Sequence, residues 1–130
     1  MQRLIRNLLT DKSLFLALAV SFLILVLSLI PPIQNELLPK VKNSDKVEHI
    51  LFYTILCLSW LFYFKSYKKL KTKLIVALGV FIYGIIIEIL QTTLTSYRTG
   101  SLYDAFANGI GILIALIFFE KVYKLALPKN

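Results

Sequence analysis

A single acidic side chain, Glu88, interrupts a long run of uncharged and mostly apolar residues. Residues 74–94 contain no other charged side chain, and Glu88 lies six positions before the end of the run. If the run is a helix, Glu88 is about 9 Å inside its end, at ~1.5 Å per residue. If that helix crosses a bilayer, inserting an ionised carboxylate at this depth costs on the order of 2.5–3.5 kcal/mol. Glu88 is therefore expected to face other helices and to find a polar partner there.

Two other segments place polar residues at helical spacing. Asp45, His49 and Tyr53 follow one another at intervals of four, so they share one face of a helix. Asp104 and Asn108 are also four residues apart, at the start of a later apolar run. A carboxylate beside His49 favours the imidazolium or fixes one tautomer, which makes His49 a candidate proton carrier. We expect both segments to bring these groups close to the carboxylate described above.

Two more polar residues accompany Glu88. Gln91 follows it by three positions and shares its helix face, and Arg98 lies in the short stretch before the next apolar run. Arg98 is expected to reach back toward Glu88. If the apolar runs cross a membrane, the segments that carry His49, Glu88 and Asn108 place their polar groups in the same leaflet.

This arrangement leaves three functions open. In a binding site, Arg98 would hold a phosphate or carboxylate with two hydrogen bonds, and neutral groups on Gln91, Asn108 and Tyr53 would complete the contacts. In an enzyme, Glu88 or His49 would act as general base and Arg98 would stabilise developing negative charge. In a scaffold, the same residues would form an ion-pair cluster that locks the helices together.

Covalent and metal chemistry have less support in the sequence. No serine or cysteine nucleophile accompanies the polar set, because Ser44, Ser96 and Ser101 fall in expected loops and Cys57 lies in an apolar run. The chain has one histidine and no His or Cys pair at metal-ligand spacing. We therefore expect no metal and no cofactor, and we expect Cys57 to be a packing residue.

The elements that carry these residues are four apolar runs. The 130 residues are 58% hydrophobic and 17% charged, whereas soluble domains are nearer half apolar and a quarter charged. Each run approaches the ~17–25 residues that a membrane-spanning helix needs, and backbone groups in lipid must be paired within a helix. The sequence predicts one domain over residues 1–130, an all-α transmembrane bundle of four helices. The expected helices cover residues 14–30, 46–64, 74–94 and 103–119.

The basic residues indicate how the runs are oriented. The net charge is +8, and most Lys and Arg residues lie in alternate connections, as cytoplasmic segments do. We expect both termini and the middle connection to be cytoplasmic, the first helix to be uncleaved, and no nucleic acid to bind. The residues expected inside are Arg3, Arg6, Lys12, Lys65, Lys68, Lys69, Lys71, Lys73, Lys121, Lys124 and Lys129, and those expected outside are Lys40, Lys42, Lys46 and Arg98.

Small residues indicate where helices approach closely. Ala107, Gly111 and Ala115 are spaced by four along the last run. Such a face suits close helix contact, either inside the bundle or between two copies in a homo-oligomer. Packing inside the bundle is the interpretation we adopt.

The polar segments together resemble the VanZ-like family of small bacterial membrane proteins. The resemblance rests on D-K-V-E-H-I-L-F-Y at 45–53, G-I-I-I-E-I-L-Q at 84–91, Arg98, and D-A-F-A-N-G-I-G at 104–111. It covers about residues 45–119, and the first apolar run matches only in hydrophobicity and in the proline after it. The functional residues that the resemblance implies are Asp45, Lys46, His49, Tyr53, Glu88, Gln91, Arg98, Asp104 and Asn108.

The resemblance implies a multi-pass protein of the bacterial cytoplasmic membrane with a role near the cell envelope. The family's namesake is linked to low-level teicoplanin resistance, and no reaction follows from the likeness. The expected partners are membrane lipids and a lipid-linked precursor or lipopeptide. We therefore expect an outer-leaflet polar site that binds an amphiphilic ligand, with an acid-base enzyme and a scaffold as the alternatives.

Overall fold

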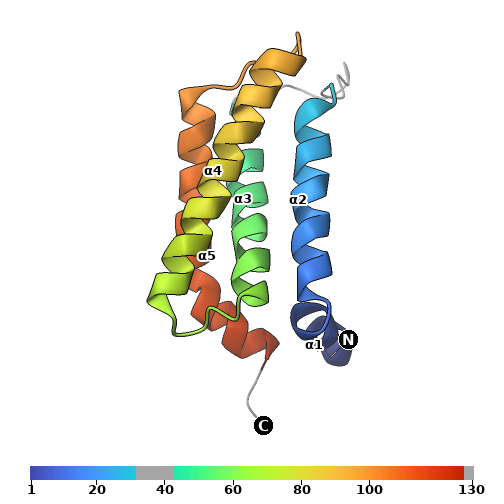
Figure 1. Ribbon diagram of the computed structural model, residues 1–130, viewed down its shortest axis with the longest axis vertical. Coiled ribbons are helices and arrows are strands. Elements are labelled where there is room, and N and C mark those ends of the chain that lie inside the picture. The colour runs from blue at the N-terminus through green and yellow to red at the C-terminus, as the bar shows by residue number, and fades with distance from the viewer. Residues whose placement is uncertain (32–42, 128–130) are drawn as a thin grey trace.

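The computed structural model describes residues 1–31 and 43–127, and these residues form helices joined by short connections, with no strand among them (Figure 1). An all-α fold is therefore confirmed. The helices are α1 (Gln2–Thr10), α2 (Ser13–Leu29), α3 (Ser44–Tyr63), α4 (Leu70–Leu94) and α5 (Leu102–Ala126).

The four expected apolar runs correspond to α2, α3, α4 and α5. The last two are longer than predicted, because α4 begins at Leu70 and α5 continues to Ala126. These extensions contain lysines, which charge counting excludes from a membrane span but which are good helix formers. The outer connection at 32–42, with Lys40 and Lys42, and the tail with Lys129 lie outside the described residues.

Helix α1 was not predicted. Its short sequence alternates apolar residues such as Leu4 and Leu8 with Arg3 and Arg6, so it is amphipathic, and none of its residues is buried. Its axis is bent by 83° from that of α2. The first charged residues, which sequence reasoning treated only as orientation signals, therefore form a surface helix of the kind that lies along a membrane interface.

By length and composition, α4 and α5 can each cross a membrane, and the bent pair α1 and α2 supplies a third span if the two count as one. Large apolar side chains are exposed along these helices; Ile86, Leu113 and Ile117 are 49%, 58% and 72% exposed. An apolar surface of this extent is unusual for a soluble monomer and is the surface that lipid would cover.

Helices α3 and α5 are in the closest contact. A side chain at Gly111 would collide with the carbonyl oxygen of Ile50, and the Thr54 hydroxyl donates to the Gly111 carbonyl at 3.0 Å. Ala107 and Ala115 are buried on the same face of α5. The spacing of small residues thus marks a contact inside the chain, and this face is not free to pair with a second copy.

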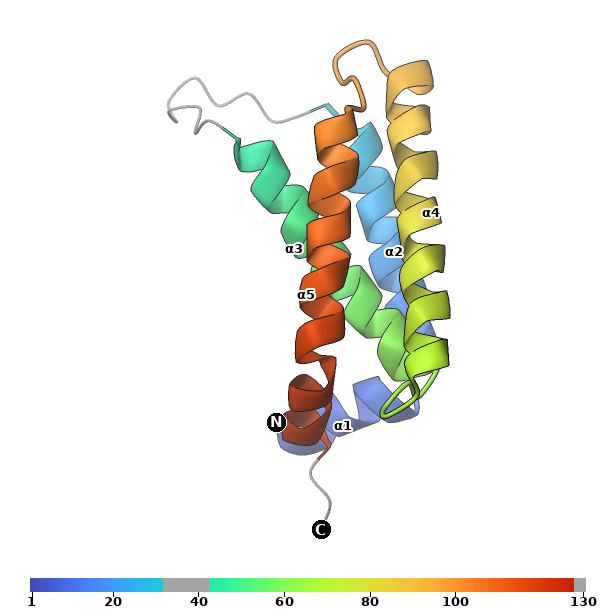
Figure 2. The ribbon, with the colours of Figure 1, turned by 90° about the vertical axis from the view of Figure 1, so that its left-hand side faces the viewer.

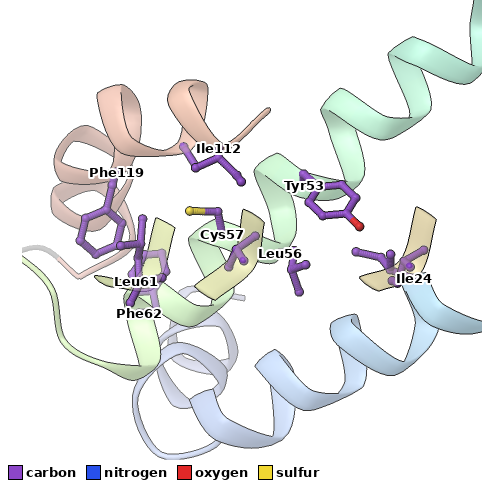
Figure 3. Close-up of a cluster of buried hydrophobic side chains, with 12 residues drawn as sticks. Ile24, Tyr53, Leu56, Cys57, Leu61, Phe62, Ile112 and Phe119 are labelled. Carbon is purple, nitrogen blue, oxygen red and sulfur yellow. The ribbon is translucent and has the colours of Figure 1, made fainter. Parts of the chain in front are cut away.

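The apolar core lies between α2, α3, α4 and α5 (Figure 3). Leu56 and Cys57 of α3 are 1% and 0% exposed, and Phe119 of α5 packs edge-on against Phe62 with ring centroids 5.2 Å apart. Cys57 is a packing residue, as predicted.

Charge is divided between the two ends of the bundle. Helix α1, the connection between α3 and α4, and the C-terminal end of α5 all lie at one end, which we call the basic end (Figures 1 and 2). The connection between α4 and α5 and the start of α3 lie at the other, which we call the polar end (Figure 2). At the basic end, Lys73 and Glu120 join α4 to α5 through a 2.6 Å ion pair.

Candidate functional site

Three helices bring His49, Glu88 and Asn108 together near the polar end. The Nδ1 atom of His49 is 2.8 Å from Oδ1 of Asn108 and 3.5 Å from Oε1 of Glu88. The His49 and Glu88 side chains are only 14% and 10% exposed. The predicted convergence of α3, α4 and α5 on one site is therefore present. We call these three residues together with Tyr53 the Glu88 cluster.

The Glu88 cluster contains buried polar atoms that make no hydrogen bond in the described part of the chain. Neither carboxylate oxygen of Glu88 accepts a hydrogen bond, and neither the Tyr53 hydroxyl nor Nδ2 of Asn108 makes one. Tyr53 and Asn108 are each 1% exposed. Because nearly all buried polar groups in native proteins are bonded, four such atoms in one place are exceptional. The cluster thus offers two acceptor oxygens, an amide donor and a hydroxyl.

Two glycines let the walls of the cluster approach. A Cβ atom on Gly84 would lie 2.8 Å from Cε1 of Tyr53 and 3.0 Å from Nδ2 of Asn108. A Cβ atom on Gly100 would lie 2.8 Å from Oε2 of Glu88, and the Gly100 amide donates to the Thr92 hydroxyl at 3.0 Å. The connection between α4 and α5 therefore folds directly over the carboxylate.

A second group of charges lies beside the cluster. The ammonium of Lys46 is 2.6 Å from Oδ2 of Asp45 and also bonds to Oδ1 of Asp104. The other Asp104 oxygen accepts hydrogen bonds from the hydroxyl and the amide of Ser101, 2.8 and 3.2 Å away, in a capping box at the start of α5. Asp104 is thus paired on both oxygens. The Ser-x-x-acid spacing of a capping box could have been recognised in the sequence.

Gln91 and Arg98 make contacts other than those expected. The amide of Gln91 donates to the carbonyl of Ser28 at 3.0 Å, so Gln91 ties α4 to the end of α2. Arg98 makes no ion pair with an acidic residue of the described chain, and its carbonyl accepts from the Thr95 hydroxyl at 3.1 Å. The expected pair of Arg98 with Glu88 is therefore absent from the described residues.

A crevice between α4 and α5 has Glu88 in its lining. Its volume is about 470 Å³, and its lining is mostly apolar, with Glu88, Thr92 and Ser101 among the few polar residues. Apolar residues form the remaining wall, including Ile89 and Leu102, which are 56% and 74% exposed.

The same region has the residue types of a metal site. His49, Glu88 and Asp104 each provide one ligand atom within 4.8 Å of the others. The ion would have to displace Lys46 from Asp104, because that carboxylate already accepts from Lys46 and Ser101. The absence of a metal stays a prediction.

Comparisons with family models, with curated proteins and with solved structures give no match to this chain. The resemblance to the VanZ-like family therefore stays a prediction that rests on the sequence motifs.

Proposed function

We propose that the protein crosses the bacterial cytoplasmic membrane four times, through α2 to α5, and binds the polar head of an amphiphilic envelope ligand at the Glu88 cluster. Both termini would be cytoplasmic, because the basic end carries most of the Lys and Arg residues. The Glu88 cluster then lies in the outer half of the bilayer.

The observation that carries this proposal is the buried carboxylate of Glu88, neither oxygen of which accepts a hydrogen bond from the described residues, although Nδ1 of His49 lies 3.5 Å from Oε1. A scaffold gains nothing from polar atoms left unbonded, since each buried unsatisfied group costs about 1–3 kcal/mol and charged groups cost more. A ligand with hydroxyl or amine donors would satisfy both oxygens of Glu88, and an acceptor on the ligand would satisfy Nδ2 of Asn108. Arg98, which is partly exposed and makes no ion pair among the described residues, would attract a phosphate group.

The crevice between α4 and α5 sets the kind of ligand. Its lining is mostly apolar and includes Glu88, Thr92 and Ser101, so it would match a molecule with a hydrocarbon chain and a hydrogen-bonding head. A lipid-linked envelope precursor or a lipopeptide has this form. The VanZ-like motifs add the expectation that such binding reduces the action of a teicoplanin-type antibiotic.

An acid-base enzyme is the second candidate, and the short distance between His49 and Glu88 favours it. The 3.5 Å separation of Nδ1 and Oε1 is close enough for proton transfer after a small adjustment, and Asn108 orients the ring. The substrate would be a group of the same amphiphile. Binding without turnover would exclude this candidate.

Glu88→Gln is the decisive variant, because the change removes the charge while preserving the size of the side chain. The matched control is Glu48→Gln, which removes an exposed carboxylate from α3 that makes no ion pair among the described residues. The protein is placed in nanodiscs, and retention of a radiolabelled polyprenyl-diphosphate-linked disaccharide and of a lipoglycopeptide is measured, together with turnover of the disaccharide lipid.

For a binding protein, Glu88→Gln should weaken retention at least tenfold, while abundance and elution volume match those of Glu48→Gln. For an enzyme, retention should survive while turnover is lost. A scaffold is indicated if Glu88→Gln instead depletes folded protein from the membrane. Retention by Glu88→Gln equal to that of the unmodified protein would refute the proposed site.

A further inference from the structure

Another cavity of the described chain lies away from the Glu88 cluster, in a groove between α2, α3 and α4. Its volume is about 690 Å³, and nearly all of its lining is apolar, including Leu18, Leu56 and Ile75. The polar groups of Trp60, Ser21 and Tyr83 in the wall are already bonded to one another: the Trp60 indole donates to the Ser21 hydroxyl at 3.2 Å, and the Tyr83 hydroxyl donates to the Ser21 carbonyl. The groove therefore suits a purely apolar occupant.

Gly79 lies in this groove and has open space beside it. Apart from its two chain neighbours and the nearby backbone of its own helix, no atom of the described residues lies within 4 Å of the position that a Cβ atom would take. Glycine inside a helix costs about 0.5–1 kcal/mol relative to alanine. No close packing inside the chain requires a glycine here, so the space is available to a molecule from outside.

The groove reaches the basic end of the bundle. Phe64 and Thr72 line it, and these two residues flank the connection between α3 and α4. The lysines of this segment are exposed and make no ion pair with an acidic residue of the described chain. They are Lys65, Lys68, Lys69 and Lys71.

We infer that the groove binds one acyl chain of an anionic phospholipid, whose phosphate lies among these lysines. Anionic lipids are attracted to basic segments beside a membrane by about 1 kcal/mol per Lys or Arg. A helix from a second copy fits less well, because a helix is about 10–12 Å wide and a space of 690 Å³ admits only about one to two turns. An acyl chain can enter completely.

Gly79→Leu tests this inference by filling the groove with a side chain. Gly109→Leu is the matched control, because a Cβ atom there meets only Phe81, at 3.8 Å, and Gly109 does not line the groove. Each protein is released from nanodiscs containing equal amounts of phosphatidylglycerol and phosphatidylcholine, and retained lipid is counted by native mass spectrometry. Elution volume reports folding and oligomeric state.

We expect the unmodified protein and Gly109→Leu to retain phosphatidylglycerol at least fivefold over phosphatidylcholine, and Gly79→Leu to lose at least nine-tenths of that lipid. Replacing Lys65, Lys68 and Lys69 with Gln should abolish the preference for the anionic lipid. If Gly79→Leu retains as much phosphatidylglycerol as Gly109→Leu, the inference fails. It also fails if the unmodified protein is a dimer that Gly79→Leu converts to a monomer, since the occupant is then a second copy.

The groove does not depend on the function proposed for the other half of the bundle. Glu88→Gln should leave the retained phosphatidylglycerol unchanged, and Gly79→Leu should leave retention of the polyprenyl-linked ligand unchanged. If Gly79→Leu lowers retention of both molecules, the protein has lost its fold. Gly79→Ala, which adds only one methyl group, is then the test, and it should retain less anionic lipid than Gly109→Ala. Equal retention by the two alanine variants overturns the inference.

Discussion

Replacement of Gly111 by alanine should separate α3 from α5 and lower stability. The new methyl group would meet the carbonyl oxygen of Ile50 and would lie 3.1 Å from the Thr54 amide nitrogen. Both are backbone atoms, so they cannot turn aside as a flexible side chain could. Overpacking of this kind costs about 1–3 kcal/mol.

Helix propensity acts in the opposite direction. Alanine is favoured over glycine inside a helix by about 1 kcal/mol, and Gly111→Ala also gains this stabilisation. Gly109→Ala measures the gain in helix propensity alone, because its methyl group would lie 3.8 Å from Phe81, an ordinary van der Waals contact. The free energy of unfolding of Gly111→Ala should therefore be about 1–3 kcal/mol below that of Gly109→Ala.

The two alanine variants can be compared by unfolding in mixed detergent micelles, with helix content followed by far-UV circular dichroism. Gly111→Ala should also weaken ligand retention, because Asn108 precedes Gly111 by one turn on α5 and contacts His49 on α3. Equal unfolding free energies for the two variants would show that α3 and α5 are not in backbone contact. The site geometry that depends on that contact would then be wrong.

Two further changes test residues around the site. Gln91→Leu removes the bond to the Ser28 carbonyl and should lower the free energy of unfolding by about 1 kcal/mol; if ligand retention falls tenfold instead, Gln91 contacts the ligand. Lys46→Met removes the ammonium partner of Asp104, whose side chain is 9% exposed, and should lower the free energy of unfolding by about 1–3 kcal/mol. Asp45→Asn is the control and should lower it less. Because Lys46 blocks the metal-ligand group around Asp104, Zn²⁺ should remain unbound in the unmodified protein after dialysis; about one retained ion per chain by elemental analysis would contradict this.

The helices and the gathering of polar groups could be predicted because both follow from local spacing. An apolar run of helical length has one stable backbone form where no water can pair its backbone groups, and the four predicted runs correspond to α2 to α5. Intervals of four set the face of each helix, which placed His49 and Asn108 on surfaces that meet. Close approach at Gly111 followed from the same spacing.

The partners of Gln91 and Arg98 could not be predicted in this way. Residues three apart in a helix differ by about 60° around its axis, since a turn takes ~3.6 residues. That angle is enough for Glu88 to face α3 and α5 while Gln91 faces α2. Which neighbour occupies each direction depends on the packing of the whole bundle. The bend before α2 also escaped prediction, because the basic residues around it were interpreted through their charge alone.

The right-angled turn between α1 and α2 affects how the protein can be labelled. Leu4 and Ile5 are 65% and 41% exposed, so α1 presents an unpaired apolar stripe at the basic end. In the proposed orientation this stripe fixes the depth of the bundle by resting among lipid headgroups. A fluorophore or affinity tag attached at Met1 would then be held against the lipid surface, where it would report on that surface and be poorly accessible to a resin.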